Sequence, residues 1–108
     1  LKNTYFRSSW EANAARILNL QKRNWLYETK TFWFENIKRG CRSYTPDFYL
    51  PNENIFIEVK GWWDQKSKTK MKRMKKYYPN IVIEIWDKDF FQATKKQGID
   101  KLIKNWEY

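Results

Sequence analysis

Apolar side chains near the start of the chain recur at the spacing of one helix face: Trp10, Ala14, Ile17 and Leu18. Ser8 precedes them and suits the N-cap, where a side-chain oxygen accepts a backbone N–H. Lys22 and Arg23 follow them and suit the negative end of the helix dipole. The pattern predicts an amphipathic helix over residues 8–23.

Stretches rich in aromatic and β-branched residues, which favour strands, occur in four places: residues 25–35, 43–50, 55–60 and 81–86. Residues 36–42, between the first two, predict a basic loop in which Gly40 supplies the turn. The last of the four reads "IVIEIW", which predicts a buried strand.

A second helix is predicted over residues 64–78, and either Asp64 or Ser67 can cap it. Its apolar face carries Met71, Met74 and Tyr78. The tail, residues 87–108, predicts two short helical stretches broken near Gly98.

The order of these elements predicts the architecture. Three sequential strands joined by turns favour an antiparallel meander, and the last strand arrives through a helix and can lie parallel to one of them. We therefore expect an α/β fold with a small mixed sheet flanked by helices. The 108 residues suit one domain, 1–108, and the start at Leu1 rather than Met suggests a piece of a longer protein.

Composition favours a nucleic-acid partner over a basic surface that has no partner. The formal charge is +10, and the chain holds seven each of Trp, Tyr and Phe. No apolar run approaches the roughly 20 residues of a membrane span. The chain has no histidine, which excludes His-based catalysis, and its only cysteine, Cys41, cannot form an internal disulfide or a zinc site alone.

The stretch "SYTPDFYLPNENIFIEVKG" predicts a hairpin with charged residues in its middle. A turn centred on Asn52 and Glu53 places Asp47 directly opposite Glu58. Opposed like charges destabilise a sheet unless a cation lies between them. Lys60 lies on the same face as Glu58, because side chains two apart in a strand share a face.

Two converging carboxylates suit a hard cation such as Mg²⁺, and the carbonyl of Val59 is a further candidate ligand. Such a metal would stabilise charge on the phosphate and lower the pKa of an attacking water, which Lys60 could orient. The alternative is structural: Glu58 and Lys60 form a solvated pair at a sheet edge, and Asp47 simply ends its strand. The combination of both halves on a basic chain favours the metal site.

Pro46-Asp47, followed by Glu58-Val59-Lys60, resembles the signature of the PD-(D/E)XK nuclease superfamily. The stretches "FRSSWEANAARIL", "SYTPDFYLPN" and "IFIEVKGWW" resemble phage-type endonuclease I, a family that resolves branched DNA. The resemblance implies a restriction-endonuclease-like core, Asp47 and Glu58 as metal ligands, and Lys60 as the catalytic lysine.

The resemblance also implies that Glu11 is an additional acidic residue of the active site. It further implies that Glu11 could act across a homodimer. From the sequence alone, Ser8 and Glu11 fit a capping box, in which the acid serves only the helix terminus.

Candidate DNA contacts are the cations of the second predicted helix, because seven like charges in eleven residues repel one another unless phosphates neutralise them. We expect phosphate contacts from Lys66, Ser67, Lys68, Lys70 and Arg73, and second-choice contacts from Arg39 and Arg42. The alternative is a solvated helix face. Trp62 and Trp63 could stack on unpaired bases, but core packing is the more common role of such residues.

Together these features predict a Mg²⁺-dependent endodeoxyribonuclease, in which Mn²⁺ can replace Mg²⁺, with branched DNA as a candidate substrate. Alternatives are a homing or repair endonuclease domain, a non-catalytic DNA-binding module of the same fold, and an RNA-binding domain. We expect no nucleotide cofactor and no membrane partner, and a location inside a bacterial or phage-infected cell.

Overall fold

The computed structural model describes residues 5–35, 37, 39–103 and 106. The first predicted helix is confirmed as α1 (Ser9–Leu20), and the hydroxyl of Ser8 caps it by accepting the N–H of Glu11 at 3.2 Å. The helix ends earlier than predicted. Lys22 adopts a left-handed φ of 57°, and Arg23 donates its N–H back to the Leu18 carbonyl, so both cations lie just beyond the helix.

The predicted mixed sheet is confirmed and has four strands in the order β1-β4-β5-β6. These are β1 (Leu26–Tyr27), β4 (Phe48–Leu50), β5 (Ile55–Val59) and β6 (Ile83–Trp86). The first three pair antiparallel, and β6 pairs parallel with β5 after the helical crossover. β6 is an edge strand with an exposed Glu84, so it is less buried than predicted.

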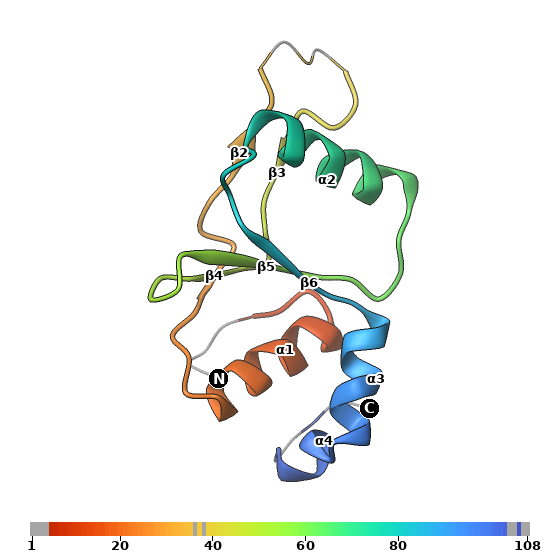
Figure 1. The fold of residues 1–108 in the computed structure, drawn as a ribbon. Helices are drawn as coiled ribbons and strands as arrows, with labels where there is room; N and C mark the ends of the chain where they lie inside the picture. Colours follow the sequence, from red (N-terminus) through yellow and green to blue (C-terminus); the bar gives the residue numbers. More distant parts are fainter. Residues whose placement is uncertain (1–4, 36, 38, 104–105, 107–108) are drawn as a thin grey trace.

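The predictions of single strands over 25–35 and 43–50 were wrong, because both strands break. Their outer parts form a separate pair, β2 (Phe32–Trp33) with β3 (Ser43–Tyr44). The break has a backbone cause: Glu28 takes a left-handed φ of 51°, and Pro46 on the facing segment has no N–H to donate. The broken hairpin therefore bends out of the main sheet (Figure 1).

The remaining helices follow the predictions. α2 (Gln65–Tyr77) is capped by Asp64, which accepts the N–H of Ser67 at 2.7 Å. The tail forms α3 (Lys88–Lys96) and α4 (Ile99–Leu102), separated at Gly98 with its φ of 75°. Within the described residues, no helix is both long and apolar enough to span a membrane.

The sheet separates two packing layers (Figure 1). On one face, α1 and α3 cover a cluster that includes Leu18, Phe48, Ile57 and Trp86. On the other face, α2 and the β2–β3 pair enclose a second cluster made of Phe32, Phe34, Tyr44, Phe56 and Met74. Since β4 and β5 contribute to both clusters, side chains at the ends of these strands lie where the two layers meet.

Candidate functional site

The β4–β5 hairpin has the predicted register, because Leu50 pairs with Ile55 and Phe48 with Ile57. Asn54 closes the turn with a left-handed φ of 55° and donates its N–H to the Leu50 carbonyl at 2.8 Å. Beyond the pair Phe48–Ile57, the next residue is Asp47 on one side of the hairpin and Glu58 on the other. The register therefore brings the two acids to the same end of the hairpin.

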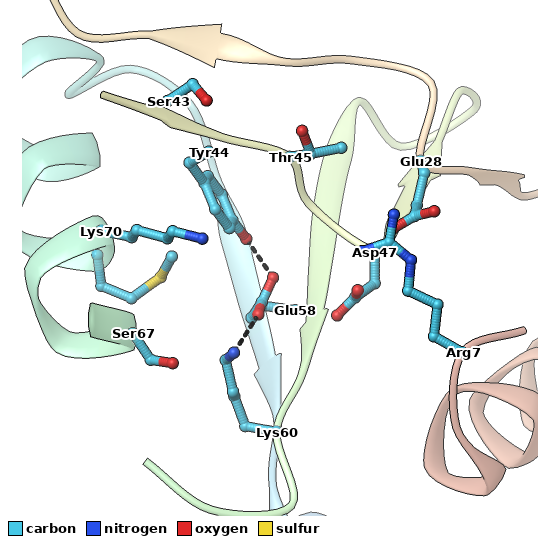
Figure 2. A pocket seen from close by; sticks show the side chains of 11 residues that line it. Arg7, Glu28, Ser43, Tyr44, Thr45, Asp47, Glu58, Lys60, Ser67 and Lys70 are labelled. Carbon is cyan, nitrogen blue, oxygen red and sulfur yellow. Dashed lines mark hydrogen bonds and ion pairs between the residues drawn. The ribbon is translucent and has the colours of Figure 1, made fainter. Parts of the chain in front are cut away.

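Glu58 is buried, with 5% of its surface exposed, and both of its carboxylate oxygens have partners. The hydroxyl of Tyr44 donates to one oxygen at 2.6 Å, and the Lys60 ammonium lies 3.0 Å from the other (Figure 2). Burial raises the pKa of Glu58, while the Tyr44 hydrogen bond and the Lys60 charge lower it in part. The predicted proximity of Glu58 and Lys60 is thus an ion pair.

Asp47 has less support: among the described residues, its side chain accepts a hydrogen bond only from the N–H of Val59, at 2.7 Å. The pKa of Asp47 is raised to about 8, mainly by burial and then by the negative charge of Glu58, which outweighs the lowering effect of the Val59 N–H. Glu11 adds to the repulsion. Asp47 is therefore a carboxyl group whose surroundings disfavour its charge unless a cation is added.

Glu11, Glu28 and Asp47 form an acidic cluster in which one oxygen of each carboxylate lies within 4.8 Å of the others. Glu11 is 8% exposed and accepts hydrogen bonds from the Tyr27 hydroxyl at 2.5 Å and the Ser8 hydroxyl at 3.1 Å. Ser8 caps α1 as the capping box requires. The carboxylate of Glu11 nevertheless accepts hydrogen bonds from two hydroxyl groups and lies in the acidic cluster with Glu28 and Asp47 of the same chain.

Three residues at the candidate site were not predicted from the sequence: Glu28, Tyr44 and Arg7. Glu28 lies 3.3 Å from the Arg7 guanidinium, and both line the same cavity as Asp47. Only the pairing of β1 with β4 reveals Glu28, since its N–H donates to the Asp47 carbonyl at 2.9 Å. The alternation that predicted the β4–β5 register carries no information on this second pairing.

The acids open into a cavity of about 380 Å³ at the boundary of the two layers. Asp47, Glu58 and Lys60 line it from the hairpin, and Ser67 and Lys70 line it from α2. Figure 2 shows the Lys70 side chain pointing towards Tyr44 and Glu58. The cavity thus has an acidic side at Asp47 and a side with two ammonium groups at Glu58.

Residues 1–99 of the chain match the model of a protein family described as "Phage endonuclease I". The chain belongs to the phage endonuclease I family.

Two curated relatives match 80 residues, which are 74% of this chain. Endodeoxyribonuclease 1 of Enterobacteria phage T3 is 34% identical, and Endonuclease I of Escherichia phage T7 is 32% identical. The match covers 51% and 52% of those proteins, so the chain spans about half the length of the curated relatives it matches.

The predicted DNA contacts differ in exposure. The exposed ones are Lys66, Lys68, Arg39 and Arg42. Lys70 is partly buried and lines the cavity, and Ser67 is buried beside it at the first turn of α2. Arg73 donates a hydrogen bond to the Cys41 carbonyl, so it also holds the loop that precedes β3.

The two tryptophans after Lys60 differ from each other. Trp62 is 75% exposed, so the prediction that it packs in the core was wrong. Gly61 lies at the bend before it and packs against the Trp10 indole, where an added Cβ would be in ordinary van der Waals contact at 3.5 Å. Trp63 is partly buried and lines an apolar groove with Met71 and Met74 of α2, as predicted for helix packing.

Proposed function

We propose that this chain is a Mg²⁺-dependent endodeoxyribonuclease domain that hydrolyses phosphodiester bonds, with branched DNA as its substrate. One observation carries the proposal. Asp47 lies among Glu11, Glu28 and Glu58 in an open cavity that also contains Lys60 and Lys70. The names of the T3 and T7 relatives support the same chemistry.

The donor set fits a hard divalent cation. The clustered donors are carboxylate oxygens, which Mg²⁺ and Mn²⁺ prefer over softer metals. Burial, followed by the negative charges of Glu58 and Glu11, raises the pKa of Asp47, and a bound cation would favour its ionised form. Asp47, Glu58 and the Val59 carbonyl would hold the ion, with Glu11 beside them. When bound, the ion supplies Lewis-acid stabilisation of phosphate oxygens and makes water more acidic.

The residues of the chain supply position and charge. Val59 fixes one oxygen of Asp47 through its backbone N–H, and Tyr44 and Lys60 fix Glu58 from two sides. An ammonium has three donors, so Lys60 keeps N–H groups for an attacking water or a phosphate oxygen while it is paired with Glu58. Lys70 lines the same cavity and would add a second positive charge there to stabilise a phosphate.

Around this site, the exposed lysines of α2 would bind the DNA backbone, because phosphate contacts position a duplex without reading its sequence. A homodimer and action inside a phage-infected bacterial cell remain part of the proposal. In this structure Glu11 approaches Asp47 of the same chain. The two acids therefore need no exchange between subunits to meet.

The decisive experiment measures cleavage of four labelled substrates of the same sequence: a linear duplex, a nicked duplex, a mismatched duplex and a four-way junction. We expect the chain to cut the junction fastest with Mg²⁺, to cut it with Mn²⁺, and to be inactive in EDTA. Glu58→Gln should abolish cutting while leaving the circular-dichroism spectrum unchanged.

Glu53→Gln is the matched control, because Glu53 is an exposed acid in the hairpin turn, paired with Arg23 at 3.5 Å and outside the cavity. It should cut as the wild type does. Full activity in EDTA would contradict the metal-dependent mechanism. Equal cutting of all four substrates would contradict the preference for branched DNA and leave the nuclease assignment intact.

A further inference from the structure

Tyr44 contacts Glu58 in the proposed site through its hydroxyl group. Its ring packs in the second cluster with Phe32, Phe56 and Met74, and only 3% of the residue is exposed. Its hydroxyl leaves that cluster and donates to Glu58 at 2.6 Å (Figure 2). Because the ring is fixed by packing in the β2–β3 layer, the position of the donor is set independently of Glu58.

The Tyr44 hydroxyl donates to Glu58 at 2.6 Å, and a phenol is a neutral hydrogen-bond donor at neutral pH. A neutral donor orients a carboxylate without cancelling its charge, which distinguishes this contact from the ion pair that Lys60 makes.

Glu58 needs such a contact because of its location. A carboxylate buried to this degree has few waters to satisfy its oxygens, and an unsatisfied buried oxygen is costly. Tyr44 occupies one lone pair of one oxygen, and Lys60 contacts the other oxygen. Each oxygen retains a lone pair, so the carboxylate is held in one rotation and can still bind a cation.

We propose that Tyr44 is a positioning residue of the nuclease site, whose hydroxyl fixes the Glu58 carboxylate in the orientation that binds the divalent ion. The inference rests on the proposed function and concerns a residue of β3, outside the hairpin that carries the signature residues. Outer partners of metal-binding carboxylates typically contribute about 10–100-fold to metal affinity or activity.

The test compares Tyr44→Phe with Tyr49→Phe. Tyr49 is a matched control because its hydroxyl also donates to a side chain, Asn54 at 2.9 Å, but at the exposed hairpin turn. Mn²⁺ affinity is measured by calorimetry without DNA, and cleavage is measured in single turnovers. Tyr44→Phe should bind Mn²⁺ about 10–100-fold more weakly and cut more slowly by a similar factor. Its affinity for DNA in EDTA should stay unchanged.

Two further measurements separate positioning from a general loss of structure. Raising the Mn²⁺ concentration should restore most of the cleavage by Tyr44→Phe, which a folding defect would not allow. In a Glu58→Gln background, Tyr44→Phe should have no additional effect on Mn²⁺ affinity, because both changes act through one carboxylate. If Tyr44→Phe does not fold, 4-aminophenylalanine at position 44 retains a donor and should bind Mn²⁺ as the wild type does.

The outcomes distinguish this inference from the proposed function. A wild type that neither binds Mn²⁺ nor cuts DNA would overturn the proposed function. A wild type that does both, with an unaffected Tyr44→Phe, would overturn the role of Tyr44 alone. An equal loss in Tyr49→Phe, or no recovery of Mn²⁺ binding with 4-aminophenylalanine, would do the same.

Discussion

Glu58 and Asp47 face the same cavity from contrasting surroundings. Glu58 has a phenol donor, an ammonium at 3.0 Å and the nearby charge of Lys70, all of which favour its ionised form. Burial and the negative charge of Glu58 are the main reasons why the ionised form of Asp47 is disfavoured; Glu11 adds to the repulsion, and one backbone N–H offsets it in part. The fold offsets the charge of Glu58 in part, although burial still raises the pKa of Glu58. The charge at Asp47 is left for a cation from outside.

The contrast is notable in a chain with a formal charge of +10. More than enough cations exist to neutralise every acid, yet the described ion pair of the acidic cluster is the exposed one between Arg7 and Glu28. A fold selected for stability alone would not gather acids there, because each unpaired buried charge costs free energy. Such local electrostatic frustration is typical of functional sites.

The largest expected effect comes from Asp47→Asn. Cleavage should fall by about 10³-fold or more, since several kcal/mol of transition-state stabilisation would be lost with the ion. The same variant should be more stable than the wild type in EDTA. Asn keeps an oxygen for the Val59 N–H and removes the repulsion from Glu11 and Glu58.

Single-turnover cleavage and urea unfolding in EDTA measure the two effects of Asp47→Asn, with Glu53→Gln as the control. A less stable Asp47→Asn variant would show that the charge at Asp47 is compensated after all. The comparison between the two acids would then be wrong.

The Glu58 side of this comparison was largely predictable from the sequence. Alternation and turn length fix the register of a hairpin, so the pairing of Leu50 with Ile55 also fixes the positions of Asp47 and Glu58 relative to each other. The proximity of Lys60 to Glu58 was also predictable, because side chains two residues apart in a strand lie on the same face. These relations depend only on neighbouring residues, which is why they survive in the folded protein.

The Asp47 side was not predictable in the same way. Five residues lie between Leu26 and Phe32, whereas four lie between their partners, Tyr49 and Tyr44, so the longer segment must bulge. The bulge falls near Glu28, whose left-handed φ no aromatic or β-branched pattern indicates. The β2–β3 pair packs against α2 in the second cluster, and this tertiary contact is not encoded in local strand propensity.

A second prediction concerns pH. The carboxyl of Asp47 changes its pKa from an ordinary 3.8 to about 8 on folding. Between these values the folded protein retains a proton that the unfolded chain has released, so the stability that Asp47 contributes is fully present below its unfolded pKa and is lost as the pH rises towards 8. Between pH 5 and 8 in EDTA, the loss should be roughly 2–4 kcal/mol after allowance for solvent in the open cavity.

Urea unfolding at several pH values measures this slope. Asp47→Asn should flatten it, and Glu53→Gln should leave it unchanged. Stability that rises steadily from pH 5 to 8 in the wild type would mean that Asp47 is ionised without cost.

A smaller effect is expected from the exposed lysines of α2. Changing both Lys66 and Lys68 to Ala should reduce the slope of log affinity against log salt by about 1.8, at about 0.9 per lost phosphate contact. The matched control changes Lys96 and Lys101 to Ala, because these exposed residues belong to α3 and α4 on the opposite face of the sheet (Figure 1). An equal change in both variants would show that net charge, and no particular surface, attracts DNA.

The smallest effect is expected from Glu28. Arg7 already neutralises it, although the Arg7 side chain is 74% exposed, and exposed pairs contribute about 0–1 kcal/mol. Glu28→Gln should therefore change stability by less than about 1 kcal/mol and cleavage by less than about 10-fold.

Arg7→Gln should strengthen metal binding. The change leaves Glu28 unpaired next to Asp47, so Mn²⁺ should bind a few-fold more tightly.

The double variant, with both Arg7 and Glu28 changed to Gln, should return to the Mn²⁺ affinity of the wild type, because it removes one charge of each sign. Calorimetric titration of the four proteins measures this cycle. If Glu28→Gln instead loses cleavage to the extent of Asp47→Asn, then Glu28 acts on the ion directly. The uncompensated charge of the cavity would then be shared by Glu28 and Asp47 and would not belong to Asp47 alone.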